Sequence, residues 1–257
     1  MARTRLNHRL EGDGQPVLLL HAVGLDLTWW DVVARSLRAD FAVVRVDLRG
    51  HGASPVPPAP WRMEDIADDV HGVLGDLGLG PAHVVGQSFG GLVAQALVLE
   101  HPEDVRSLVL SGTSCTTSAD EYEVFVGRAE AAERGGMAAV TQAALDRWFT
   151  APFMTSEVVE RARRRLLADD VAGWASTFGA IAHHNTLDRL HEVTVPTLVI
   201  TGDADVATPP SMSRTMADAI PGARLHLMPG APHMGPFERP DLFLPELTAF
   251  LAQVSRG

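Results

Sequence analysis

A serine between glycines is the first group in the sequence that could carry out covalent chemistry. Residues 86–91 read Gly-Gln-Ser-Phe-Gly-Gly, directly after the apolar run 83–85 and directly before a stretch with helical spacing. A G-x-S-x-G motif between a strand and a helix is typical of a strained turn that exposes the serine hydroxyl and leaves no room for side chains beside it. We therefore predict that Ser88 is a nucleophile and that the Phe89 amide, at a helix N-terminus, helps to bind an oxyanion.

A serine hydroxyl needs a base to accept its proton, and His233 is the histidine best placed for that role. It lies in the turn-rich sequence Gly-Ala-Pro-His-Met-Gly, residues 230–235, directly after the last apolar run that indicates a strand. The other histidines, such as His71 and His101 on predicted helices, lack this context. We expect those histidines on the surface or hydrogen-bonded in the core.

The base in turn needs an acid that orients its ring, and two aspartates compete for that role. Asp203 and Asp205 both follow the apolar run 197–201, whereas residues 111–114, after the preceding run, contain no carboxylate. Asp203 directly follows a glycine at the end of the strand, where a carboxylate commonly caps the turn. Asp205 lies two residues further on, ahead of a Thr-Pro helix start, so it can project toward His233. We predict that Asp205 is the acid.

These groups must be positioned by a framework of strands and helices. Apolar runs that indicate strands buried on both faces alternate with amphipathic helical patterns, which predicts an α/β fold with a mostly parallel sheet flanked by helices. The predicted strands are 16–21, 41–47, 83–86, 107–110, 197–201 and 224–228, and the predicted helices are 28–37, 65–77, 91–100, one after Pro209, and 240–254.

The segment 115–191 interrupts this alternation, because it has a helical composition and no strand pattern, with amphipathic stretches at 137–149 and 156–167. We predict that residues 1–114 and 192–257 form one core. The segment between them would be a helical cap over the carboxyl ends of the strands, where open α/β sheets bind ligands. A separate helical domain is the alternative, but the segment is flanked on both sides by strands of one sheet, which argues against it.

Composition limits the partners that the protein is expected to have. The 257 residues carry 32 acidic and 21 basic side chains, and the net charge of −11 disfavours binding to nucleic acids or membrane surfaces. The single cysteine, Cys115, excludes a disulfide within the chain and a cysteine-cluster zinc site. The sequence has no apolar run of about 18 residues, no signal-peptide core, no phosphate-binding glycine loop and no metal-ligand cluster. We expect a cytoplasmic protein that acts on a small molecule without a cofactor or metal, and the oligomeric state is not indicated.

In the motifs around Ser88, Asp205 and His233 and in their order, the chain resembles the α/β-hydrolase superfamily, and the resemblance covers nearly its whole length. Residues 21–24, His-Ala-Val-Gly, are similar to the family's oxyanion loop, although Ala22 replaces the usual glycine. The resemblance implies that the Val23 amide is the second oxyanion donor, beside that of Phe89. Residues 47–54 match another family signature, for which the resemblance implies a structural and not a catalytic role.

Within the superfamily, the sequence most closely resembles the 3-oxoadipate enol-lactonases. The similar stretches are Arg147–Thr150, Gly173–Trp174, Ala180–Ala182 and Val206–Pro210. In that group an acidic residue is expected near Asn185, where this chain has His183-His184-Asn185. The role of these three residues, and the substrate itself, therefore stay open.

Two residues of the predicted cap are candidates for substrate binding. Arg147 could contact an anionic group, and Trp148 could line the pocket or anchor the cap. The arginines at 161 and 163–165 share a helix with apolar residues on its opposite side, which favours a solvated outer face.

Together these residues predict a serine hydrolase that cleaves a small carboxylic ester or lactone through an acyl-enzyme. Ser88 would attack the carbonyl, His233 would move the proton, and Asp205 would orient the imidazole. A cofactor-free haloperoxidase or perhydrolase, a meta-cleavage C–C hydrolase and a thioesterase stay open as alternatives on the same residues. A ligand-binding protein without hydrolytic activity is the alternative from another class.

Overall fold

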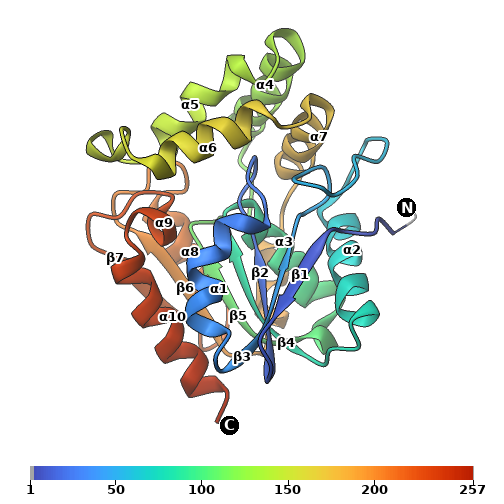
Figure 1. Ribbon diagram of the computed structural model, residues 1–257, viewed down its shortest axis with the longest axis vertical. Helices are drawn as coiled ribbons and strands as arrows, with labels where there is room; N and C mark the ends of the chain where they lie inside the picture. Colours follow the sequence, from blue (N-terminus) through green and yellow to red (C-terminus); the bar gives the residue numbers. More distant parts are fainter. Residues whose placement is uncertain (1–2, 257) are drawn as a thin grey trace.

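A seven-stranded sheet with helices on both faces forms the centre of the computed structural model, which describes residues 3–256 (Figure 1). The strand order is β1-β3-β2-β4-β5-β6-β7, with β1 antiparallel to β3 and the other neighbours parallel. The strands are β1 (His8–Glu11), β2 (Gln15–Leu20), β3 (Phe41–Val46), β4 (Ala82–Gln87), β5 (Val105–Ser111), β6 (Thr197–Gly202) and β7 (Arg224–Met228). The mostly parallel sheet expected from the sequence is confirmed.

Successive side chains of the central strands point to opposite faces of the sheet, and each face packs against its own helices. Val17 and Leu19 of β2 belong to a buried cluster with α1 and α10, whereas Leu18 and Leu20 belong to a cluster with α2, α3 and α8. Both faces of the sheet are therefore buried from solvent, which explains why the strands appear in the sequence as continuous apolar runs. The helices next to the sheet are α1 (Asp31–Leu37), α2 (Met63–Asp76), α3 (Phe89–Glu100), α8 (Pro210–Ala219), α9 (Gly235–Glu238) and α10 (Pro240–Val254), with short 3-10 helices η1 (Leu27–Trp30) and η2 (Pro102–Asp104).

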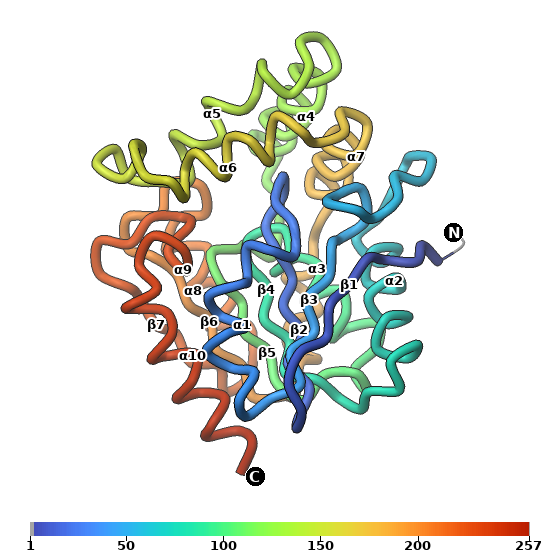
Figure 2. The backbone as a smooth tube through the Cα atoms, in the orientation of Figure 1, coloured from blue at the N-terminus to red at the C-terminus, as the bar shows by residue number. Residues whose placement is uncertain are grey.

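Between β5 and β6 the chain forms a further layer of helices at one end of the sheet (Figures 1 and 2). We call this the helical layer; it contains α4 (Ala119–Gly135), α5 (Ala138–Trp148), η3 (Ala151–Phe153), α6 (Glu157–Leu167), α7 (Val171–Ala182) and η4 (Leu187–Glu192). Its two ends meet, because Thr116 and Asn185 form an antiparallel bridge and the Thr186 amide donates to the Cys115 carbonyl at 2.8 Å.

Capping residues explain where two helices of this layer begin. At the start of α4, the Ser118 hydroxyl accepts from the Glu121 amide at 3.3 Å, and the Glu121 carboxylate accepts from the Ser118 amide at 2.8 Å. This reciprocal pair is a capping box, which satisfies two amides that the helix itself leaves unpaired. At the start of α7, the Asp170 carboxylate accepts from the Gly173 amide at 2.8 Å.

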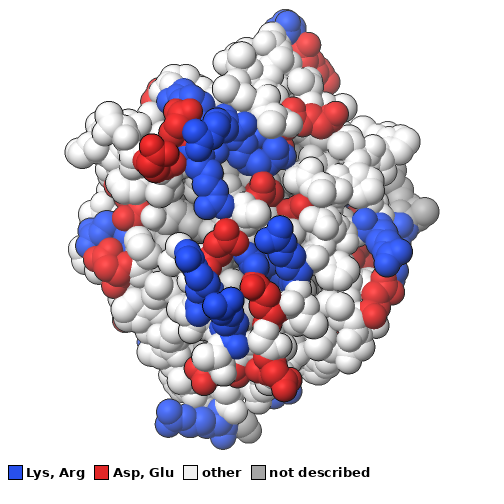
Figure 3. All heavy atoms as spheres, viewed as in Figure 1, with Lys and Arg blue, Asp and Glu red and all other residues white. Residues whose placement is uncertain are grey.

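The arginines of α6 are exposed to different degrees, so the expected solvated face is only partly correct. Figure 3 shows basic side chains gathered over α6 with acidic side chains beside them. The Arg164 side chain is 64% exposed, as expected, whereas the Arg165 side chain is only 16% exposed. Arg165 pairs with Asp169 and, at 3.3 Å, with Asp26 of the loop after β2.

Among residues 3–256, no helix is both long enough and apolar enough to cross a bilayer.

Candidate active site

The turn between β4 and α3 holds Ser88 in a strained backbone conformation. Ser88 has φ 53° and ψ −115°, a region that L-residues seldom occupy. The neighbouring glycines are required, because a Cβ at Gly86 would lie 2.3 Å from the Gly90 carbonyl oxygen and one at Gly90 would lie 2.2 Å from that of Leu20. The Thr113 hydroxyl donates to the Ser88 carbonyl at 2.8 Å and helps to hold the turn.

Ser88, His233 and Asp205 form one continuous chain of hydrogen-bonding groups. The Ser88 Oγ lies 3.0 Å from His233 Nε2, and His233 Nδ1 lies 2.9 Å from Asp205 Oδ2. His233 and Asp205 are each only 3% exposed, while Ser88 is partly exposed at a pocket. The structure thus brings together the three residues that the sequence predicted, from loops after β4, β6 and β7.

Asp205 is held in place as an ionised hydrogen-bond acceptor. Its Oδ1 accepts from the amides of Ala207 and Thr208, both at 2.8 Å, and its Oδ2 also accepts from the Thr208 hydroxyl at 2.8 Å. Burial alone would raise the pKa of Asp205, but the charge of His233 and the hydrogen bonds from His233 and Thr208 outweigh it and lower that pKa. The carboxylate therefore stays charged and fixed in orientation.

Two glycines make room for Asp205 and His233 beside the end of β5, the strand that lies between β4, which precedes Ser88, and β6, which precedes Asp205. A Cβ at Gly112, directly after β5, would lie 3.3 Å from Asp205 Oδ2, and one at Gly202 would lie 1.9 Å from the Ala231 carbonyl oxygen. Gln87 Nε2 also donates to the His233 carbonyl at 2.8 Å, which ties the histidine loop to the strand that precedes Ser88.

Asp203, the competing acid in the sequence, lies elsewhere. Its side chain is exposed and accepts a hydrogen bond of 2.6 Å from the Gly230 amide. Asp203 thus joins the end of β6 to the loop after β7, and the carboxylate that bonds to His233 is that of Asp205.

The loop after β2 brings Val23 to the pocket that also holds Ser88 and Phe89. Its conformation is fixed by His21, whose Nε2 accepts from the Leu48 amide at 2.9 Å, so that Nδ1 donates to the Ala22 carbonyl at 2.8 Å. Burial lowers the pKa of His21, and the ring stays neutral. Ala22, which replaces the family's usual glycine, is fully buried in the core.

The signature at residues 47–54 connects loops below the pocket and does not line it. The Asp47 carboxylate accepts from the amides of Leu27 at 2.7 Å and Ala53 at 2.8 Å, and from the Asn7 side chain at 2.7 Å. Burial lowers the pKa of His51 to about 3, so this ring is neutral where it stacks on Phe89.

The pocket lies between the ends of the strands and the helical layer. Both predicted cap residues line it, since Arg147 and Trp148 lie on its wall with Ser88 and His233. Further walls come from α4 and α7, through Phe125, Arg128, Trp174, Phe178 and Ile181.

Arg128 is a pocket residue that the sequence analysis did not identify. Phe125, Arg128, Ala129 and Ala132 follow the i, i+3, i+4, i+7 spacing of one helix face. A charged residue within an otherwise apolar stripe is a pattern that could have revealed it.

His183, His184 and Asn185 do not line the pocket that contains Ser88. They lie at a second cavity with residues of α2 and α3. Burial lowers the pKa of His184 to about 4, and Asn185 is part of the bridge that joins the two ends of the helical layer.

Comparisons with known proteins agree with this fold and arrangement. Residues 15–240 match the alpha/beta hydrolase fold family, and the chain therefore belongs to that family, as its sequence motifs predicted. The crystal structure of the enol-lactonase from Burkholderia xenovorans LB400 superposes with a TM-score of 0.93, at 34% identity over 97% of each chain. A thermophilic esterase from Thermogutta terrifontis, solved with malate bound, superposes with a TM-score of 0.92, at 30% identity over 98% of this chain and 94% of that one. The 3-oxoadipate enol-lactonase 2 of Acinetobacter baylyi is 28% identical over 235 residues, 91% of this chain and 87% of that protein.

Proposed function

We propose that this α/β hydrolase cleaves a small carboxylic ester or lactone that carries a negative charge, through an acyl-enzyme on Ser88. The observation that carries the proposal is the chain from Ser88 Oγ to His233 Nε2, at 3.0 Å, and from His233 Nδ1 to Asp205, at 2.9 Å, at the wall of a pocket. A nucleophile, a base within hydrogen-bond reach and an acid behind the base are what acyl transfer requires.

In the first half of the reaction, Ser88 Oγ attacks the carbonyl carbon while His233 Nε2 accepts its proton. The new negative charge on the carbonyl oxygen is bound by the amides of Val23 and Phe89, which are preorganised by the loop after β2 and by the start of α3. Asp205 stabilises the imidazolium that forms and keeps Nδ1 protonated.

The tetrahedral intermediate then collapses: its bond to the leaving alkoxide oxygen breaks, His233 gives that oxygen its proton, and the acyl-enzyme on Ser88 is formed. In the second half, His233 takes a proton from a water that attacks the acyl carbon, and it returns this proton to Ser88 Oγ as the bond between Ser88 and the acyl group breaks. With an open-chain ester, the alcohol leaves before this step. With a lactone, the alkoxide stays attached to the acyl group, so a single ring-opened hydroxy acid leaves after deacylation, with Ser88 restored.

Two arginines in the pocket support a substrate with a carboxylate. Arg128 and Arg147 are partly buried, and within residues 3–256 neither guanidinium has a hydrogen bond or an ion pair. The Arg128 guanidinium lies over the rings of Phe125 and Phe178, at 5.2 and 5.6 Å from their centroids. Burial and the charge of Arg147 lower the pKa of Arg128 to about 10, and burial also lowers the pKa of Arg147. Arginine side chains keep their charge in proteins, and a bound anion would offset the burial of these two charges and their mutual repulsion.

The relatives support the same substrate class. Two of them are named enol-lactonases, and the Thermogutta terrifontis esterase was solved with malate, a small dicarboxylate. We further propose that residues 115–191 act as a cap that selects the substrate, because α4, α5 and α7 supply most of the pocket wall outside the reacting groups.

A fluorophosphonate probe together with a substrate panel tests the proposal. The probe should modify Ser88 in the intact protein, as read by mass spectrometry of the peptide that contains it, and Ser88→Ala should not be labelled. Lactones and p-nitrophenyl esters with a carboxylate should be cleaved with higher kcat/KM than neutral esters of equal length. A protein that neither labels at Ser88 nor cleaves any member of the panel would be a binding protein and not a hydrolase.

A further inference from the structure

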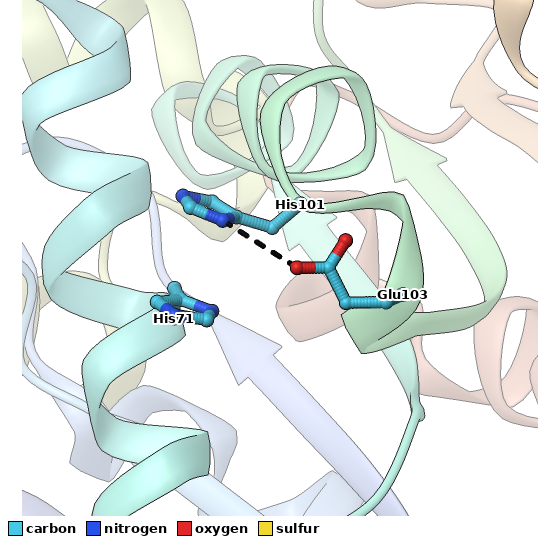
Figure 4. Close-up of side chains that lie close together, drawn as sticks. All are labelled: His71, His101 and Glu103. Atoms are coloured by element: carbon cyan, nitrogen blue, oxygen red, sulfur yellow. Dashed lines mark ion pairs between the residues drawn. The ribbon is translucent and has the colours of Figure 1, made fainter.

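A second group of side chains able to do chemistry lies far from the pocket, where α2 meets the end of α3 (Figure 4). His71 belongs to α2, His101 directly follows α3, and Glu103 lies in η2. Because α3 is 12 residues long, the group lies about 18 Å along this helix from Ser88, which precedes its first residue. It therefore has no part in the proposed reaction.

The two imidazole rings are parallel and close. Their centroids are 4.1 Å apart and their planes differ by 8°. One ring nitrogen from each histidine and one carboxylate oxygen of Glu103 lie within 4.8 Å of one another. The His71 and His101 side chains are 43% and 19% exposed, so an ion from solvent can reach them.

Each ring is also held by a carboxylate of its own. His71 Nδ1 donates to Asp104 at 2.6 Å, and His101 Nε2 donates to Asp68 at 2.8 Å. A histidine that binds a metal commonly donates its second nitrogen to a carboxylate, which fixes the tautomer and makes the free nitrogen a better ligand. Asp68 and Asp104 therefore occupy the positions that outer-sphere carboxylates have in metal sites.

The remaining nitrogen of His101 faces Glu103 without a hydrogen bond. Since Nε2 carries the proton, Nδ1 of a neutral ring has a lone pair, and it points to Glu103 Oε1 at 3.9 Å. Two acceptors face each other there, and a cation between them would satisfy both. Tetrahedral zinc with ligands at about 2.1 Å holds neighbouring ligand atoms about 3.4 Å apart. Binding therefore requires the exposed Glu103 side chain to move inward and the two parallel rings to turn so that a nitrogen of each points to one common position.

We propose that His71, His101 and Glu103 bind a divalent transition-metal ion, with Zn²⁺ as the best fit, and that the ion connects α2 to the end of α3. Two imidazoles and a carboxylate suit zinc, nickel and copper, whereas Mg²⁺ and Ca²⁺ prefer oxygen ligands alone. An exposed site with three protein ligands leaves a fourth position for water. The ion would stabilise the folded chain without entering the pocket.

Calorimetric titration of the chelator-treated full chain with ZnCl2 tests this site. We expect one saturable site per chain, no binding of Mg²⁺ or Ca²⁺, and a rise of about 5 to 10 °C in Tm at about 100-fold excess over Kd. His71→Ala and His101→Ala should each weaken binding at least about tenfold, and Asp104→Asn should weaken it about 10- to 100-fold through the His71 ring.

His226→Ala is the matched control, because it removes another surface histidine that lies beside a carboxylate, Glu246, at 3.6 Å. This variant should bind Zn²⁺ as the unmodified chain does. Binding that survives in His71→Ala and His101→Ala but disappears in His233→Ala would place the ion in the pocket and overturn the proposal. Absence of saturable binding at Zn²⁺ concentrations up to about 100 µM would also overturn the proposal.

Discussion

The carbonyl oxygen of Trp148 accepts a hydrogen bond of 2.9 Å from the amide of Met234, the residue directly after His233. Two residues further along the chain, Thr150 donates its amide and its hydroxyl to Glu238, at 3.0 and 2.5 Å. The helical layer is therefore joined by hydrogen bonds to the loop that carries the proposed base. The pocket wall at Trp148 and the loop of the proposed base are thus joined through a backbone hydrogen bond, which favours a constant position of His233 relative to that wall.

The first prediction concerns the proposed nucleophile and base. Ser88→Ala and His233→Ala should each lower kcat by at least about 10⁴-fold, because members of such a group act as a unit. Steady-state kinetics on the best ester or lactone measures this, and circular dichroism should show an unchanged fold. Ser213→Ala is a control at a buried serine outside the pocket. Turnover by pure Ser88→Ala near the original rate would contradict the mechanism.

The second prediction separates the two aspartates after β6. Asp205→Asn should lower kcat by about 10⁴-fold at neutral pH, because an amide cannot hold His233 in the reactive tautomer. Asp203→Asn should leave kcat unchanged and cost at most about 1 kcal/mol of unfolding free energy, through its bond to the Gly230 amide. Kinetics and thermal melts of both variants decide the matter, and the reverse pattern would assign the acid to Asp203.

The third prediction tests the two pocket arginines. Arg128→Ala and Arg147→Ala should raise KM for carboxylate-bearing esters about 10- to 100-fold, because each removes a charge-assisted hydrogen bond to the substrate. KM for neutral esters should change by less than about threefold. Arg134→Ala is the matched control on α4, because this exposed arginine pairs with Glu130 outside the pocket. Equal losses on charged and neutral esters would show that the arginines are not an anion site.

The fourth prediction concerns the buried Asp169, which pairs with Arg165 beside the loop after β2. Burial raises the pKa of Asp169 to about 7, despite the charge of Arg165. Because the unfolded chain loses this proton near pH 4, the free energy of unfolding should fall as pH rises from about 4 to about 7 and then level off.

The Asn side chain of Asp169→Asn has no proton to lose, so this variant lacks that fall in the free energy of unfolding. Relative to the unmodified chain, the variant should therefore gain on the order of 3 kcal/mol of unfolding free energy from pH 4 to pH 8. Urea denaturation at a series of pH values measures it. Asp218→Asn, at an exposed position on α8, is the control and should show no such shift. A pH-independent difference for Asp169→Asn would contradict the raised pKa.

The sequence predicted the sheet, and it predicted which serine, aspartate and histidine lie together, because both depend on local patterns. Strands buried on both faces require unbroken apolar runs, such as Val17–Leu20. The turn around Ser88 requires glycines at fixed spacing, since any Cβ at Gly86 or Gly90 would collide with backbone. The choice of Asp205 over Asp203 followed from their order after the strand, and the structure places only Asp205 beside His233.

Features that depend on contacts between distant segments were missed. The edge strand β1 is short and polar, and it forms because His8–Glu11 pairs with β3, where Glu11 meets Arg45. The predicted helix 28–37 is divided into η1 and α1. Likewise, His71 and His101 are 30 positions apart in the chain, so no ligand spacing pointed to their contact.

The meeting of Thr116 with Asn185, and of Cys115 with Thr186, has a consequence for how this protein could change. A segment whose entry and exit lie side by side can be replaced by another of different length without moving either flanking strand. Under the proposed roles, the residues that select the substrate and those that break the bond thus lie on separate segments of the chain. Transplanting the helical layer of a related hydrolase onto β5 and β6 would exchange the substrate range while keeping Ser88, Asp205 and His233 on their own scaffold, provided that the grafted segment reproduces the backbone bond to Met234.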